Sequence, residues 1–172
     1  TAYAMIMRGR AHAALGRADD GIAEMERGCS GWRALGAELA TTQMSVGLAD
    51  ACTKAGRIAA GLDHIEVAAE HARTFHERLL EAEIDRVRGE LLLKPAATGD
   101  AEASLRRSIE IARSQKARSL ELRTSMILAR LWEHQNRRAA AYGLLAPIYN
   151  WFSEGFDSPD LRDARTLLDD LA

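Results

Sequence analysis

The chain has 172 residues, 47% of them hydrophobic and 28% charged, a composition typical of globular rather than disordered or collagenous proteins. Its net charge of -2 and pI of about 6.2 lack the basic excess of nucleic-acid-binding proteins, so we expect no nucleic acid among its partners. Strong helix formers are abundant and aromatic residues make up only 5%, which favours an all-α fold.

The sequence also carries signals about its cellular location. No apolar run approaches the roughly 20 residues of a membrane span, and no basic segment followed by an apolar stretch marks a secretory signal. We therefore expect no membrane partner. Cys29 and Cys52, the only cysteines, are too few for a disulfide framework and are expected to be buried residues of a reduced, cytoplasmic protein. Because Thr1 opens directly into a helical pattern, we expect a fragment of a longer protein.

Four stretches of the sequence repeat at a spacing of 40 residues. In each, two predicted helices flank a short turn, and small residues recur where the helices must approach closely. The small residues of the first helices are Gly9, Ala49, Gly89 and Ala129. Those of the second helices are Gly21, Gly61, Ala101 and Ala141. Four positions later, on the same helical face, the second helices carry Met25, Ile65, Leu105 and Leu145.

In chain order, the pattern predicts four helix pairs over 2–15 and 19–34, 38–55 and 59–75, 78–94 and 101–116, and 118–134 and 138–153. The corresponding repeats are about 1–36, 37–76, 77–117 and 118–157. Pro95 is expected to end the helix before it, because its ring cannot continue a helix. Thr98, Gly99 and Asp100 are expected to form the turn that follows.

A last helix is predicted over 158–172. Ser158 suits the N-cap position, Pro159 the first helical position and Asp160 the acidic first turn. Its apolar stripe consists of Leu161, Ala164, Leu167, Leu168 and Leu171. We expect this amphipathic helix to cap the open end of the repeat array.

The small residues, the turn and the small–large–small pattern of the second helix resemble the tetratricopeptide repeat. Its usual aromatic position is occupied by His12, Cys52, Leu92 and Trp132. The 40-residue period exceeds the roughly 34 residues of the usual repeat and indicates longer helices or connections. The resemblance implies a right-handed α-solenoid of four long tetratricopeptide-like helix pairs plus a capping helix.

A closer resemblance covers nearly the whole chain. Residues 144–161, with 88–93 and 106–113, resemble the C-terminal region of large bacterial signalling proteins. In those proteins a nucleotide cyclase or a DNA-binding regulator domain precedes an AAA-type ATPase and a tetratricopeptide array. The resemblance implies a regulatory C-terminal arm, with the catalytic domains upstream.

No sequence motif indicates catalysis, so we expect no enzyme activity and no cofactor. A phosphate-binding loop and a dinucleotide-binding glycine motif are both missing, and Ser30 lacks the G-x-S-x-G frame of a nucleophile. His64 and His71 stand two turns apart, about 10 Å along a helix, too far for one zinc ion. We expect both, with His76, to lie on the solvated surface. The aromatic residues Trp132, Tyr149, Trp151, Phe152 and Phe156 are expected to pack the last repeat against the capping helix.

In tetratricopeptide arrays the first helices line a concave groove, and the register transfers that face to this chain. Apolar groove positions would include Tyr3, Ile6, Val46, Leu93 and Met126. The polar candidates for partner binding are Arg10, Gln43, Asp50, Lys54, Glu83, Arg86, Glu90, Lys94, Arg123, Arg130, Glu133 and His134. Mixed charges beside apolar anchors suit a protein or peptide segment. The lysine and asparagine that would clamp a chaperone C-terminus are replaced, so we expect no chaperone-tail role.

The sequence therefore favours a non-catalytic scaffold that binds a protein or peptide, or its own upstream ATPase, as a regulatory arm. The alternative is a domain that senses a small-molecule inducer lodged between the first helices. A homodimer through an exposed apolar face at the truncated N-terminus is a further hypothesis, since such faces favour association.

Overall fold

The computed structural model describes residues 1–94 and 98–172. Over these residues the chain forms nine helices and no strand, which confirms the predicted all-α class. The first helices of the pairs, the A helices, are α1 (Ala2–Ala14), α3 (Thr41–Ala55), α5 (Glu81–Leu93) and α7 (Arg118–His134). The second, the B helices, are α2 (Ala18–Ala34), α4 (Ile58–Thr74), α6 (Thr98–Ser114) and α8 (Arg138–Tyr149), and α9 (Pro159–Leu171) ends the array.

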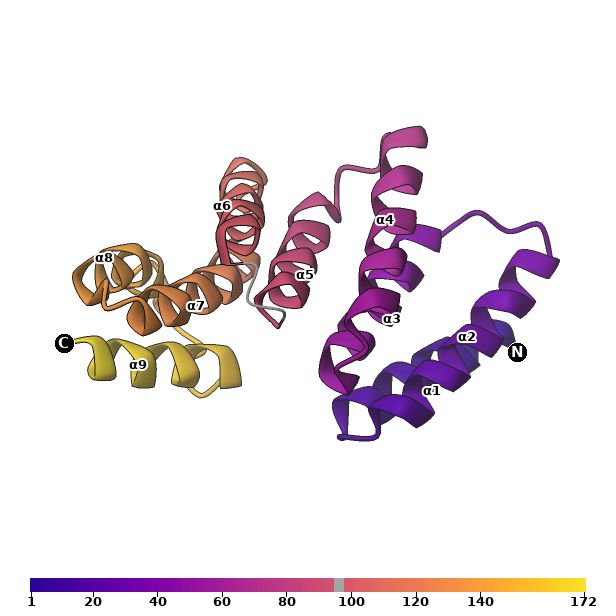
Figure 1. Ribbon diagram of the computed structural model, residues 1–172, viewed down its shortest axis with the longest axis horizontal. Helices are drawn as coiled ribbons and strands as arrows, with labels where there is room; N and C mark the ends of the chain where they lie inside the picture. The colour runs from indigo at the N-terminus through magenta and orange to yellow at the C-terminus, as the bar shows by residue number, and fades with distance from the viewer. Residues whose placement is uncertain (95–97) are drawn as a thin grey trace.

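The helix pairs stack into an arch with the two chain ends at opposite sides (Figure 1). Consecutive A helices lie close together, as α1 with α3, α3 with α5 and α5 with α7. Among the described residues, no Cα atoms of consecutive B helices approach within 8 Å. The A helices therefore form the tightly packed inner side of the curve, and the predicted solenoid is confirmed.

The 40-residue period is visible in the helix boundaries. The four B helices begin at Ala18, Ile58, Thr98 and Arg138. The predicted turn at 98–100 is wrong, because Thr98, Gly99 and Asp100 form the first turn of α6. Pro95, expected to end the preceding helix, lies outside the described residues.

Two A helices begin three residues later than the sequence predicts, at Thr41 and Glu81 instead of 38 and 78. Before α3, Ala40 has a left-handed backbone with φ of 67°, which interrupts a right-handed helix. Turns run from Glu38 to Thr41 and from Arg78 to Glu81, closed by backbone hydrogen bonds of 3.1 and 3.3 Å. The connection before α7 is shorter, so that helix begins at Arg118, as predicted.

The predicted small residues bring the paired helices together, since all eight are buried. The large residues that follow them, Met25, Ile65, Leu105 and Leu145, are fully buried. Cys52 is also fully buried, as expected, whereas Cys29 remains half-buried. The core therefore runs along the whole array between the A and B helices, as nearest-neighbour packing in a solenoid requires.

The capping helix α9 buries its predicted apolar stripe against α7 and α8. Ser158 precedes Pro159 at the N-cap position, although its side chain makes no capping hydrogen bond. Helix α8 ends at Tyr149, earlier than the predicted 153. Pro147 lies within its last turn and has no N–H to donate to the carbonyl four residues before.

The aromatic cluster is only partly used for packing. Trp132 is buried between the guanidinium groups of Arg106 and Arg137, 4.9 and 4.5 Å from its ring centre. Tyr149 and Phe152 pack against the same core. The other two members contradict the expectation, because Trp151 and Phe156 are exposed. Of the helices described, none is long and apolar enough to span a membrane.

Candidate partner-binding groove

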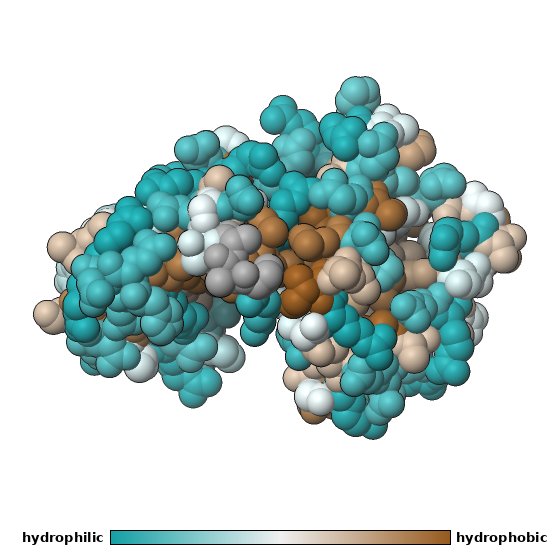
Figure 2. Space-filling model, viewed as in Figure 1, coloured by the Kyte–Doolittle hydropathy of each residue, from teal (hydrophilic) through white to brown (hydrophobic). Residues whose placement is uncertain are grey.

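The inner side of the arch contains two adjoining hollows, which we call the groove. The first hollow, of about 700 Å³, is lined by residues of α1, α3, α5 and α7. The second, of about 1030 Å³, extends the first toward α9. Asp50, Lys54 and Arg86 line both, so the hollows are continuous. In the space-filling view the surface is notched between the α1 end and the α9 end (Figure 2).

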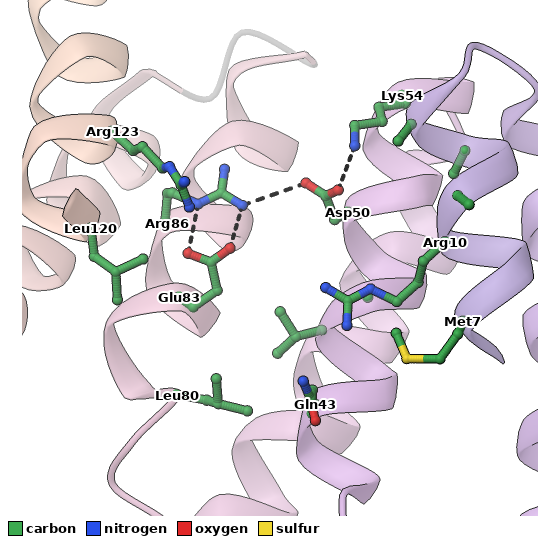
Figure 3. A pocket seen from close by; sticks show the side chains of 15 residues that line it. Met7, Arg10, Gln43, Asp50, Lys54, Leu80, Glu83, Arg86, Leu120 and Arg123 are labelled. Carbon is green, nitrogen blue, oxygen red and sulfur yellow. Dashed lines mark hydrogen bonds and ion pairs between the residues drawn. The ribbon is translucent and has the colours of Figure 1, made fainter. Parts of the chain in front are cut away.

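Arg86 organises the wall that the two hollows share (Figure 3). Helical spacing places Glu83, Arg86 and Glu90 on one face of α5. The Arg86 guanidinium donates two hydrogen bonds to Glu83, of 2.8 and 2.7 Å, and one of 2.8 Å to Glu90. It also reaches Asp50 on α3 at 3.4 Å, and Lys54 donates to the other Asp50 oxygen at 2.7 Å. The cluster therefore joins α3 to α5.

Burial and charge shift the ionisation of this cluster. Burial lowers the pKa of Arg86, but the carboxylates of Glu83, Glu90 and Asp50 outweigh it and raise the pKa above its ordinary value. Burial raises the pKa of Glu90, and the neighbouring Asp50 and Glu83 charges add to the rise against the pull of Arg86. Arg86 is thus a permanent cation that pairs with three carboxylates of its own chain while it also lines both hollows.

Three other cations of the groove form no ion pair with the described part of the chain. Arg10 lies on α1, Arg130 lies on α7, and Lys94 directly follows α5. All three are exposed and line the groove. Within residues 1–94 and 98–172, no carboxylate oxygen lies within 4 Å of their charged nitrogens. Figure 3 shows Arg10 extending from α1 into the first hollow. The groove therefore offers positive charge that the described part of the chain does not neutralise.

The structure brings together eleven of the twelve predicted polar residues. In the first hollow lie Arg10, Gln43, Asp50, Lys54, Glu83, Arg86 and Arg123. In the second lie Asp50, Lys54, Arg86, Glu90, Lys94, Arg130 and His134. Glu133 lines neither hollow and instead lies 3.8 Å from Arg138.

Several apolar positions do not line the groove as expected. Ile6 and Met126 are core residues, with 3% and 6% of their surface exposed. Tyr3 lies against Trp32, with ring centres 6.1 Å apart, and lines neither hollow. Val46 and Leu93 do line it. The 40-residue spacing therefore predicts where the groove lies. It does not distinguish the residues that line the groove from the core residues beneath them.

The sequence reasoning missed the contribution of α9. Asp160 and Asp163 line the second hollow, and Asp160 accepts a hydrogen bond of 2.6 Å from Arg123 of α7. From the sequence, Asp160 is expected only to be an acidic first-turn residue of the capping helix. Its place beside Arg123 depends on how α9 packs, a feature that helical spacing alone does not define.

Two of the three histidines depart from the expectation of a solvated surface, whereas His76 is exposed as expected. His71 has only 10% of its side chain exposed and lies 3.0 Å from the Thr42 hydroxyl. Its ring also stacks against Phe75, with centres 4.3 Å apart. His64 is half-buried and lines a separate crevice. The described residues contain no group of three or more His, Cys, Asp or Glu placed to hold a metal ion.

Comparisons with known proteins identify which folds this chain resembles. No protein-family profile and no curated protein sequence matches the chain. Among solved structures, it is similar to the nearly identical TPR-like repeats of a kinesin light chain-like protein from Podosopora anserina. The TM-score is 0.74 at 13% identity, over 98% of this chain and 84% of that one. A second structure of those repeats gives a TM-score of 0.73 at 13% identity over the same shares. These likenesses establish a tetratricopeptide-like fold.

Proposed function

We propose that the chain is a non-catalytic scaffold that binds a protein or peptide segment along its groove. The observation that carries the proposal is the continuity of the two hollows along four A helices. A continuous groove suits an extended or helical segment better than a compact ligand, and curved solenoids use such concave surfaces for binding.

The charges of the groove indicate what that segment carries. Arg10, Lys94 and Arg130 have no carboxylate partner among residues 1–94 and 98–172, whereas Arg86 already binds the carboxylates of Glu83, Glu90 and Asp50. A partner segment with acidic side chains would complement the free cations, and complementary charge sets specificity and association rate. The bound segment is therefore expected to be acidic.

A peptide-display selection on the immobilised chain tests this function. Enriched peptides should be rich in Asp and Glu, and they should lose binding to the variant Arg10→Glu/Arg130→Glu. Arg86 is avoided because its removal would disturb the fold. Equal binding of the enriched peptides to the groove variant would contradict the proposal.

The matched control is Arg27→Glu/Arg165→Glu. Both residues are exposed, lie on α2 and α9, and line neither hollow. This variant changes the net charge by the same amount, so it should keep the peptides that the groove variant loses. Loss in both variants would indicate a general charge effect.

The biological setting we propose is a bacterial signalling protein of the cytoplasm, in which this chain is a C-terminal regulatory arm. The proposal rests on the sequence resemblance of 144–161, 88–93 and 106–113. The partner would then be another protein or the ATPase domain of the same chain. Co-expression of the chain with that ATPase domain, followed by co-purification at increasing salt, tests an intramolecular arm.

Sensing of a small-molecule inducer between the A helices is the alternative function. The large volume of the second hollow favours it, because small-molecule sites occupy roughly 300–1,000 Å³. The continuity of the groove and its abundant charge favour a peptide instead. Selection of no peptide by the folded chain would shift support to the inducer.

Self-association is supported by exposed apolar side chains along α1 and at its C-terminal end. Tyr3, Met7 and Leu15 are exposed, with 50%, 36% and 74% of their surface accessible, and Met7 also lines the first hollow. An isologous contact between two α1 helices would cover them. Sedimentation of the wild type and of Met7→Lys/Leu15→Lys at several concentrations tests this contact, and a concentration-independent monomer would contradict it.

A further inference from the structure

Two crevices with equivalent positions in successive repeats lie away from the groove. The first crevice, of about 290 Å³, lies between α2, α3 and α4, and the second, of about 480 Å³, lies between α4, α5 and α6. Neither shares a lining residue with the two hollows of the groove. Most lining positions of the first crevice recur 40 residues later in the second, so the two are the same site of successive repeats.

Charged side chains occupy the second crevice. Asp85 lies at its base, 5% exposed, and accepts a hydrogen bond of 2.7 Å from Arg107 Nε and a second bond from the same guanidinium. Arg88 approaches the same carboxylate at 3.4 Å. The polar groups of this crevice are therefore satisfied by one another.

The first crevice replaces each of these three charges with a neutral residue. Ser45, Leu48 and Val67 stand where the second crevice has Asp85, Arg88 and Arg107. Ser45 is only 7% exposed, and no described residue forms a hydrogen bond with its hydroxyl. Because this hydroxyl remains accessible from the crevice, it is free to accept a hydrogen bond from a bound molecule.

The remaining lining of the first crevice is mostly apolar and aromatic. Met44 and Leu48 form its base with Ser45, Trp32 and Cys29 come from α2, and His64 comes from α4. The Trp32 ring is held in place, because its Nε1 donates to the Leu39 carbonyl at 2.9 Å. Aromatic and sulfur-containing side chains contact flat rings favourably.

The interior of the first crevice is uncharged. Burial lowers the pKa of His64, so its ring is neutral at pH 7, and burial raises the pKa of the Cys29 thiol, which keeps it protonated. The charged residues Arg33 and Asp63 are exposed and belong to the rim. The volume lies at the lower end of the roughly 300–1,000 Å³ of small-molecule sites.

We propose that the first crevice binds a small, neutral, flat aromatic molecule that donates a hydrogen bond to Ser45. The site is separate from the peptide groove, so failure of this inference would not affect the proposed function, and failure of the proposed function would not affect this inference. Indole is a suitable probe, because it is flat and neutral and carries one N–H donor.

The test is a titration of the whole chain with indole, followed by NMR of methyl-labelled methionine. The chain has five methionines, and only Met44 lines the crevice. The Met44 methyl resonance should shift and saturate, while those of Met5, Met7, Met25 and Met126 stay in place. No saturable shift of Met44, or similar shifts of several methionines, would overturn the proposal.

Two variants sharpen the test. Val67→Arg introduces the residue of the second crevice at a position that is 51% exposed, so folding should persist and indole should bind about tenfold more weakly or worse. Ser45→Ala should weaken indole by roughly two- to tenfold, but it should leave 1-methylindole, which lacks the N–H, unchanged. If Val67→Arg binds indole with wild-type affinity, the proposed site is wrong. If Ser45→Ala weakens indole and 1-methylindole equally, the proposed hydrogen bond to Ser45 is wrong.

A groove variant separates this site from the proposed function. Arg10→Glu/Arg130→Glu should bind indole as the wild type does, because neither residue lines the crevice. Loss of indole binding in that variant would contradict a separate site.

Discussion

Gly9 of α1 and Gly21 of α2 pack so closely that neither position has room for a side chain. A Cβ added to Gly9 would lie 2.6 Å from the Gly21 carbonyl oxygen, and one added to Gly21 would lie 2.5 Å from the Gly9 carbonyl oxygen. Both obstacles are backbone atoms, which cannot rotate away. This contact sets the spacing between the two helices of the first pair.

The substitution Gly21→Ala should therefore destabilise the first helix pair by about 1–3 kcal/mol, the usual cost of overpacking. The measurement is urea denaturation followed by circular dichroism. Gly143→Ala is the matched control, because it lies inside α8 with no heavy atom within 4 Å of an added Cβ. It should stabilise the helix by roughly 0.5–1 kcal/mol. Equal effects of the two substitutions would contradict the close contact.

The Arg86 cluster predicts a large loss of stability when its only arginine is removed. Arg86→Met would leave the partly buried carboxylates of Glu83, Glu90 and Asp50 facing one another without that cation, at a cost of about 1–3 kcal/mol, below that of a fully buried ion pair. Urea midpoints at pH 7 measure the loss. Arg10→Met removes a groove arginine without a carboxylate partner and should change stability by less than about 0.5 kcal/mol. Similar midpoints for the two variants would show that the cluster does not hold α3 to α5.

The raised pKa of Glu90 predicts how the stability of the folded chain changes with pH. Its pKa is raised in the folded chain, so its favourable contribution to stability is complete below the unfolded pKa of roughly 4.3 and is lost as the pH rises through the folded pKa. The stability of the wild type relative to Glu90→Gln should therefore fall as the pH rises from about 4 toward neutrality. Urea midpoints of both proteins across that range give the difference. A difference that stays constant or rises would contradict the raised pKa.

The two cysteines should differ in reactivity. Cys52 is fully buried and Cys29 is half-buried, and burial raises the pKa of both thiols, which lowers the reactive thiolate fraction. In the native chain, iodoacetamide should modify Cys29 slowly and leave Cys52 unmodified until urea unfolds the protein. Intact-mass spectrometry over time measures both reactions. The variant Cys29→Ser is the control, and rapid native labelling of it would show that Cys52 is accessible.

The sequence by itself determined the repeat architecture. A 40-residue period fixes which residues share a helical face, because side-chain direction along a helix follows from residue number. It therefore identified the close-packed glycines, the buried large residues such as Ile65, the stripe of α9 and most of the groove. It failed at the starts of α3 and α5, where turns with left-handed residues such as Ala40 delay the helix.

Only the tertiary structure decided which side chains meet across helices. Arg86 pairs with Asp50 from 36 residues away, Asp160 of α9 joins Arg123, and His71 is buried against Thr42. The same holds for Ser45 and Asp85, which are equivalent in register yet differ because only Asp85 has an arginine within reach. These outcomes depend on the angle between neighbouring helices and on side-chain reach. A residue period constrains neither, since it describes each helix along its own axis and not its packing against the next.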